Sequence, residues 1–256
     1  MGTLRGNNSL LLRRVTQHVK DQNWLAVGID FIIVVVGVFI GLQVSNWNDA
    51  RADRALRSEY LTQLTADLRA DMEEAGDTAA SYWQRAAAIE DVFEAAGLQA
   101  PLAELYNEGA VFKAPPYPDF ESDYPYAHNH KITFLPQFEI STETFDTLVA
   151  NGHFELLRDA ELVRQIQGYY RLLDRARNLE ASIIRANSTL SEARYDNGIP
   201  LTGRTTLEDL ATAVKADKRL AASLDSNFML SASNAGTMVG VQQAAMALIE
   251  AIEEMR

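Results

Sequence analysis

"VGIDFIIVVVGVFIGLQVSNWND", residues 27–49, is the stretch on which the architecture depends. It belongs to an apolar run from Trp24 to Val44, 21 residues in which only Asp30 and Gln43 are strongly polar. As a helix this run is about 30 Å long, which matches the hydrocarbon thickness of a bilayer. The run is too long for the apolar part of a cleavable signal peptide, and a poor cleavage site follows it. We therefore predict an uncleaved transmembrane helix.

Charge is distributed unevenly along the chain. Residues 1–20 carry four basic residues and no acid, whereas the whole chain has a formal net charge of −12, which leaves −16 on residues 21–256. Because juxtamembrane cations favour the cytoplasmic side, we predict a cytoplasmic N-terminus in a bacterial inner membrane and a periplasmic C-terminal domain. The acidic body is a poor nucleic-acid binder, because phosphate contacts need Lys and Arg. Cysteine is absent, which excludes disulfides, thiolate metal sites and cysteine nucleophiles.

The polar and small residues of the span share one helix face. At about 100° per residue they lie on or near one line along the helix; they are Asn23, Asp30, Gly37, Gly41, Ser45 and Asn48. Small residues let helix backbones approach closely, and polar groups in lipid point toward protein. This face therefore predicts a helix–helix interface, with Asp30 as a candidate proton carrier. The alternative is that Asp30 lies near the headgroups, two turns into the helix, and is merely tolerated.

The pattern after the span stays helical. Apolar residues recur at steps of three or four from Leu56 to Phe93, which predicts one long helix over about residues 48–96. Gly97 and Pro101 are stop signals for this helix. Gly76, inside the helix, is a candidate kink.

The C-terminal half predicts four more helices. A short one has Ser141 as its cap, and a long one opens at Asp159 and ends at the "DNGIP" sequence of residues 196–200. Thr205 and Glu208 form a capping-box pattern that starts a helix of about 15 residues. A last helix is predicted from about Ser233 to the C-terminus.

These elements predict an all-α protein. A single N-terminal transmembrane helix leads into an elongated antiparallel helical bundle with one aromatic and proline-rich loop insertion. The predicted parts are a basic cytoplasmic segment (residues 1–22), the transmembrane helix (23–47) and the extracytoplasmic domain (48–256). The loop insertion, residues 97–140, lies within that domain.

The insertion contains the best candidates for metal ligands in the sequence, two histidines. Six of the seven prolines lie between Pro101 and Pro136, among seven aromatic side chains. A short strand is predicted at residues 131–135, and in extended chain His128 and His130 would face the same side and could reach one metal ion. The pattern lacks a strong metal-binding spacing, so we expect no metal and no cofactor. The aromatic segment is interpreted as a satellite core on the bundle, with a binding surface as the alternative.

Several of these residues resemble a known pattern. The N-terminal region is similar to a family of uncharacterised bacterial single-pass membrane proteins, in which a basic segment precedes an apolar helix with an early acid, glycines and a Leu-Gln-x-x-Asn-Trp-Asn sequence. The matching residues here are Asp30, Gly37, Leu42, Gln43, Asn46, Trp47 and Asn48. Residues 144–170 also resemble the middle segment of that family. The resemblance implies the topology given above and no particular activity, and Asp30 stands where family members often carry Glu.

A second resemblance concerns the layout alone. A short basic tail, one span with an early aspartate and a periplasmic domain is similar to stator subunits of the ExbD, TolR and MotB type, in which the aspartate carries protons. The large helical domain predicted here differs from their small α/β domain.

The leading functional hypothesis is a non-enzymatic anchored protein. We expect it to lie in the lipid bilayer and to assemble with itself or with another inner-membrane protein, through the face that carries Asp30, Gly37 and Gly41 and through its long helices. The alternatives are a periplasmic ligand sensor acting through a partner, a proton-coupled subunit that uses Asp30, and a metal-dependent enzyme. No catalytic motif such as G-x-S-x-G, a Walker loop or H-E-x-x-H occurs in the sequence.

Overall fold

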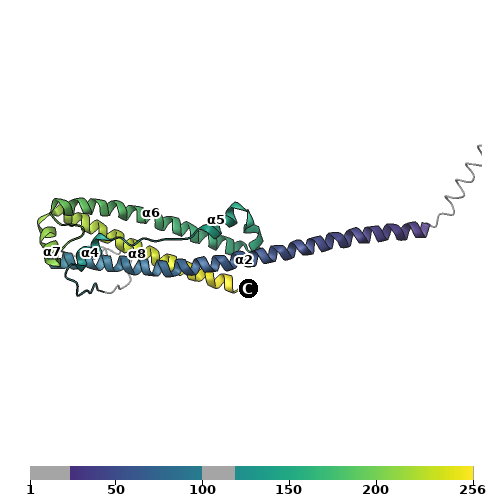
Figure 1. The fold of residues 1–256 in the computed structure, drawn as a ribbon, viewed down its shortest axis with the longest axis horizontal. Coiled ribbons are helices and arrows are strands. Elements are labelled where there is room, and N and C mark those ends of the chain that lie inside the picture. Colours follow the sequence, from purple (N-terminus) through teal and green to yellow (C-terminus); the bar gives the residue numbers. More distant parts are fainter. Residues whose placement is uncertain (1–23, 100–118, 256) are drawn as a thin grey trace, which may run out of the picture. The chain divides into compact units, whose positions relative to one another are not determined.

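A computed structural model describes residues 24–99 and 119–255, and no β-strand occurs within these ranges. The predicted all-α fold is confirmed (Figure 1). The chain divides into two compact units, residues 1–56 and 57–256. The predicted basic segment and most of the loop between residues 97 and 119 lie outside the described residues.

Helix α2 (Trp24–Ala95) is continuous over 72 residues, so the apolar run and the first helix of unit 2 are one element. It contains no proline, and its ladder of backbone hydrogen bonds is therefore not interrupted. The helix ends where the sequence predicts. Gly97 has a φ of +69°, the left-handed conformation that favours glycine, and Leu98 N donates to the Phe93 carbonyl at 2.9 Å.

Unit 2 is built on three long helices: residues 57–95 of α2, together with α6 (Ala160–Asp196) and α8 (Lys218–Glu253). The chain runs in the same direction in α2 and α6 and in the opposite direction in α8 (Figure 1). Arg85 on α2 contacts Asn187 on α6 and Asn227 on α8, so the three helices meet around one side chain.

The connection between α2 and α6 contains short helices where a strand was expected. Helix α4 (Ala127–Thr133) occupies part of the segment predicted as a strand, and that prediction is wrong. An irregular stretch, residues 134–142, then returns along the bundle, which lets α6 begin at the same end of unit 2 as residue 57 of α2. It leads to α5 (Glu143–Ala150), whose N-cap is Thr142 and not Ser141 as predicted.

A 3₁₀ helix, η1 (His153–Leu157), follows α5 and precedes α6. Gly152 enters it with a φ of +67°. The predicted opening of α6 is confirmed, because the Asp159 carboxylate accepts hydrogen bonds from the N–H groups of Glu161 and Leu162.

Helix α7 (Leu207–Ala216) is shorter than predicted, and its capping box lies one residue later, at Thr206 and Asp209. Helix α8 begins at Lys218 and not near Ser233, so the predicted start of the last helix is wrong by 15 residues. Asp217 alone separates the two helices. It ends α7 and caps α8 by accepting hydrogen bonds from the N–H groups of residues 219 and 220.

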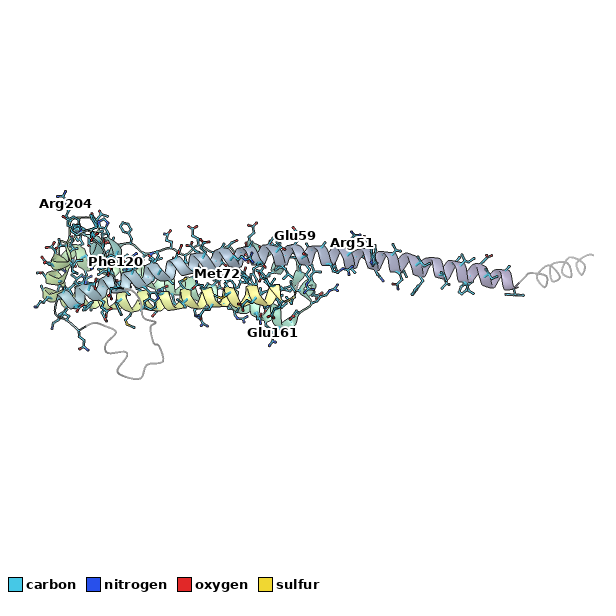
Figure 2. The ribbon with its side chains drawn as sticks, turned by 90° about the horizontal axis from the view of Figure 1, so that it is seen from below. Arg51, Glu59, Met72, Phe120, Glu161 and Arg204 are labelled. Carbon is cyan, nitrogen blue, oxygen red and sulfur yellow. The ribbon has the colours of Figure 1, made fainter. Side chains whose placement is uncertain are left out.

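The core of unit 2 consists of two clusters of buried apolar side chains along the bundle. One is centred on Leu64, Ile166 and Val241, and the other on Ile89, Leu190 and Phe228. Phe120 packs against the second cluster, as expected for a satellite core on the bundle. Figure 2 places Phe120 near one end of unit 2 and Glu161 near the other.

Candidate functional site

The face predicted to mediate helix–helix contact lies on α2 within unit 1. Asp30, Gly37, Gly41, Ser45 and Asn48 are all exposed, and Asn23 lies outside the described residues. A Cβ atom added at Gly37 or at Gly41 would meet nothing within 4 Å. The face is therefore open in this chain, and a partner backbone has room to approach the glycines. That it mediates assembly remains a prediction.

The apolar run of α2 carries its side chains outward. Its most apolar stretch of 18 residues has a mean hydropathy of 2.5, and none of this stretch is buried. Phe31, Phe39 and Trp47 are among the exposed large side chains. Within the described part of the chain, α8 also has the length and hydropathy to cross a membrane. However, α8 places side chains such as Phe228, Val241 and Ile252 in the core of unit 2, which is typical of a core helix.

The two histidines proposed as weak metal candidates do not converge. Positions two apart on a helix are separated by roughly 200°, so His128 and His130 on α4 face different sides. His128 Nε2 lies 2.8 Å from Asp91 Oδ2, whereas the His130 ring packs edge-on against Tyr124 at 5.5 Å. Over residues 24–99 and 119–255, no group of three or more potential ligands could hold a metal ion. The metal hypothesis assumed that both imidazoles face the same side, and that assumption is wrong.

The bundle contains a fully buried arginine that the sequence analysis did not single out. Arg85 is 0% exposed, and among the described residues its hydrogen bonds are all to neutral acceptors. Its Nε donates to the carbonyl of Ile132 at 3.1 Å, and Nη1 donates to Ser231 Oγ at 2.7 Å. Its Nη2 donates to Asn187 Oδ1 and to Asn227 Oδ1, both at 2.8 Å. The guanidinium thereby ties α2 to α4, α6 and α8.

Burial lowers the pKa of Arg85 to about 10, which leaves the guanidinium protonated at neutral pH. A second buried arginine, Arg194, has its pKa lowered to about 10 by the same cause. Arg194 donates to Thr133 Oγ1 at 2.7 Å and to the carbonyl of Pro200 at 3.1 Å, and it also contacts Asn129 Oδ1. Both arginines hold α4 against the bundle. The geometry of this network therefore supports a structural role.

A second polar group lies between α2, α6 and the segment before α5. Asp71 is buried, and its Oδ2 accepts a hydrogen bond from the Tyr169 hydroxyl at 2.7 Å. Burial raises the pKa of Asp71, and the charge of Asp67 raises it further. The Tyr169 hydroxyl, the Ser141 N–H and the charge of Arg177 lower it.

Two polar atoms next to this group are unsatisfied. Within the part of the chain that the structure describes, the buried Oδ2 of Asp67 and the hydroxyl of Tyr170 have no hydrogen-bond partner. The Tyr170 ring stacks on Phe145 of α5 with centroids 3.9 Å apart, and burial with the charge of Asp71 raises its pKa. Unsatisfied buried polar atoms are costly, so a proton taken up by this group should be stabilising.

We expect the free energy of unfolding to contain a term from Asp71 that increases as the pH falls. Since its pKa is raised in the folded state, the folded state binds the proton more readily than the unfolded chain between the two pKa values. The Asp71 penalty is thus present at neutral pH and is relieved as the pH falls through the raised pKa. In Asp71→Asn the amide oxygen can still accept from Tyr169, so the variant should lose this pH-dependent term and exceed the wild type in stability most clearly at pH 7.5.

Urea unfolding of both proteins at several pH values, followed by circular dichroism, measures this difference. Asp123→Asn, which changes an exposed acid just before α4, is the matched control and should retain the wild-type pH dependence. Parallel pH profiles for wild type and Asp71→Asn would contradict the prediction.

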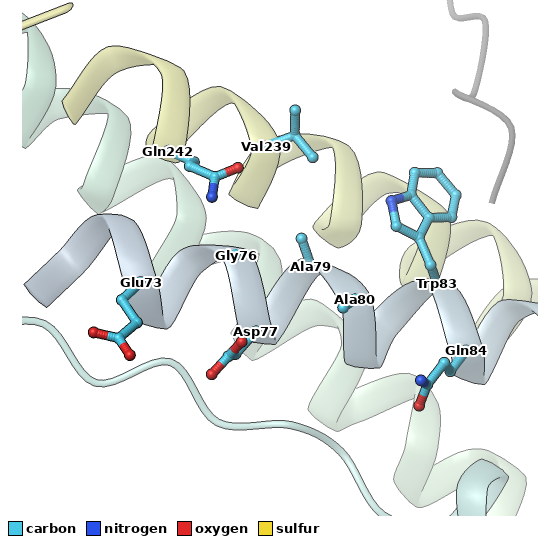
Figure 3. A pocket seen from close by; sticks show the side chains of 9 residues that line it. All are labelled: Glu73, Gly76, Asp77, Ala79, Ala80, Trp83, Gln84, Val239 and Gln242. Carbon is cyan, nitrogen blue, oxygen red and sulfur yellow. The ribbon is translucent and has the colours of Figure 1, made fainter. Parts of the chain in front are cut away.

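A cavity of about 560 Å³ lies between α2 and α8 in unit 2 and is lined by Gly76, Trp83, Gln242 and neighbouring residues (Figure 3). A Cβ at Gly76 would come within 2.8 Å of Gln242 Nε2, which donates to the Met72 carbonyl at 3.4 Å. The atom that a Cβ would meet is the end of a flexible side chain, which can move aside. Helix α2 continues through Gly76 without a break, and the kink stays a prediction. In Figure 3 Glu73 and Asp77 extend from α2 on the side away from Val239, so these acids do not converge with Trp83 on one ligand position.

Comparison with protein-family models, with curated proteins and with solved structures found no match for this chain. The class of the protein is therefore defined by its own geometry: an all-α chain in which one apolar, outward-facing helical segment continues into a helical bundle.

Proposed function

We propose that the chain is a non-enzymatic, membrane-anchored assembly or accessory subunit. Residues 23–47 would span the bacterial inner membrane once, with the basic segment in the cytoplasm and the bundle in the periplasm. The resemblance to uncharacterised single-pass membrane proteins supports this topology. The partner would be another copy of the chain or a different inner-membrane protein.

The observation that carries the proposal is the open polar and small-residue face of α2. A carboxylate in the hydrocarbon region is costly, and intramembrane acids usually face protein or a polar cavity. Asp30 shares its face with Gly37 and Gly41, whose Cβ positions are empty space, and nothing else within the chain covers them over the described residues. A partner helix on this face would shield Asp30 and pack against both glycines.

The mass and composition of the protein extracted from its own membranes in mild detergent test this proposal. A homo-oligomer would support self-assembly, and a second membrane protein at fixed stoichiometry would support an accessory role. A single copy of the chain at all concentrations, with nothing bound before or after chemical cross-linking in the membrane, would contradict both.

A proton-coupled subunit is the second candidate, because Asp30 is the one carboxylate in the apolar run. We expect Asp30→Asn to weaken assembly by about threefold and at most about tenfold, since single hydrogen bonds between membrane helices are individually modest. Quantitative cross-linking of wild type and variant over a dilution series in lipid measures this change. An intact assembly that has lost proton-dependent activity of its partner would favour the proton-coupled candidate over simple assembly.

A further inference from the structure

A second cavity lies in unit 2, at the C-terminal end of α6. Its volume is about 540 Å³, within the range of ligand pockets, and its apolar side is formed by Ile199, Pro200 and Leu201. Tyr195, in the last turn of α6, stands at the same cavity with 82% of its surface exposed. Leu201 is 43% exposed. The Tyr195 ring and Leu201 are therefore open to solvent beside the cavity, where a ligand can reach them.

The charged side of the cavity is acidic. Glu192 and Asp196 are four residues apart on α6 and therefore lie on one face of the helix. Both bind the same guanidinium, since Arg219 Nη1 lies 2.7 Å from Asp196 Oδ2 and Nη2 lies 3.3 Å from Glu192 Oε2. The three charged side chains that line the cavity therefore sum to −1, and the buried guanidinium of Arg194, which donates to the Pro200 carbonyl, lies behind the apolar side. Two of the five N–H donors of Arg219 are engaged by these carboxylates, which reduces its attraction for an anionic ligand.

We infer that this cavity docks a basic and apolar peptide segment of a partner protein. A Lys or Arg side chain would lie over the Tyr195 ring within reach of Glu192 and Asp196, where a cation–π contact and two carboxylates favour it. A neighbouring apolar side chain would cover Leu201 and Pro200, which are exposed at the cavity. The strongly acidic balance of residues 21–256 favours the approach of such a segment. The site shares no residue with the α2 face, so its failure would leave the proposed membrane assembly unaffected.

The test is a titration of the full chain in a neutral detergent with a fluorescently labelled, capped peptide of alternating Lys and Leu. A peptide of alternating Glu and Leu is the charge control, and one of alternating Lys and Ser is the apolar control. We expect saturable binding of the Lys-Leu peptide that weakens with added salt, and weaker binding of both controls. Tyr195→Ala should weaken binding of the Lys-Leu peptide by about fivefold, because it removes the ring face.

Charge variants separate this site from the general acidity of the protein. The double variant Glu192→Gln with Asp196→Asn leaves Arg219 unpaired and should exchange the preference, so that the Glu-Leu peptide binds more tightly than the Lys-Leu peptide. Asp174→Asn with Ile184→Ala changes an exposed acid and an exposed apolar residue of the same helix outside the cavity. Equal losses in the cavity variant and in this control, or unchanged binding in Tyr195→Ala, would overturn the inference.

Discussion

Replacing Arg85 with alanine should lower the free energy of unfolding by about 3–5 kcal/mol, a large part of the total stability of an ordinary domain. The substitution removes a side chain with no exposed surface and leaves Asn187, Asn227 and Ser231 without their common donor. The Ile132 carbonyl at the end of α4 loses its contact as well. Urea unfolding of the full chain in detergent, followed by far-UV circular dichroism, measures the loss.

Two further variants show how the effect arises. Arg69→Ala removes an exposed arginine whose ion pair with Glu253 lies at the surface, and it should cost less than about 1 kcal/mol. Arg85→Met keeps most of the volume but donates no hydrogen bond, so we expect a loss between those of the two alanine variants. If Arg85→Met were as stable as wild type, the desolvation cost of the buried charge would equal the value of its hydrogen bonds, and the network would contribute to specificity alone.

Gly41→Ile should dissociate the membrane assembly, weakening association by at least about tenfold. The open space above Gly41 accommodates the new side chain in the isolated chain, so the fold of the protomer is expected to persist. In an assembly the same space would be filled by the backbone of the partner helix, which a branched side chain would displace. Cross-linking in native membranes and the mass of the detergent-extracted protein measure the effect.

Gly28→Ile is the matched control for this variant. Gly28 lies in the same helix and also has nothing within 4 Å of its Cβ position, but it is placed roughly 160° around the axis from Asp30. We expect Gly28→Ile to keep the wild-type mass. An assembly that survives Gly41→Ile and is lost in Gly28→Ile would assign the interface to the opposite face of α2.

The long helices could be predicted from the sequence because their apolar stripes are regular. The stripe of α2 beyond the span was predicted from its spacing, and members such as Leu64, Leu68, Ile89 and Phe93 are buried. Strong local signals also placed the helix ends, since Asp159 caps α6 and Gly97 and Gly198 adopt positive φ angles. Periodicity and capping are properties of short segments, and a single sequence displays them directly.

The start of α8 and the Arg85 network were missed for the same physical reason. The core face of α8 near its start carries Ser223, Asn227, Ser231 and Asn234, all of which are buried. Polar residues at core positions weaken the apolar period, so the sequence favoured a helix that begins only at residue 233. Arg85 explains two of those polar side chains, Asn227 and Ser231, but its side-chain partners lie more than 100 residues away and no local pattern connects them.

The histidine pair shows why short helices are difficult to predict from sequence. Helix α4 has seven residues, too few for a helical period to be visible, and it lies between Pro125 and Pro136. The prolines and aromatic residues favoured extended chain, in which His128 and His130 would share a side. The helix separates them instead, and the tertiary contacts of Arg85 and Arg194 with α4 stabilise it. The α2 face, by contrast, follows from helical geometry alone, and its assembly role awaits the variants above.

The Arg85 contacts also affect the order in which the chain can fold during synthesis. The acceptors lie 47, 102, 142 and 146 residues after Arg85, so they leave the ribosome one after another. Until Asn227 and Ser231 have been made, α2 and α6 have no third helix to cover their shared apolar surface. The nascent chain therefore carries an incomplete bundle for most of its translation. Chaperones that bind exposed apolar helices would act in this interval.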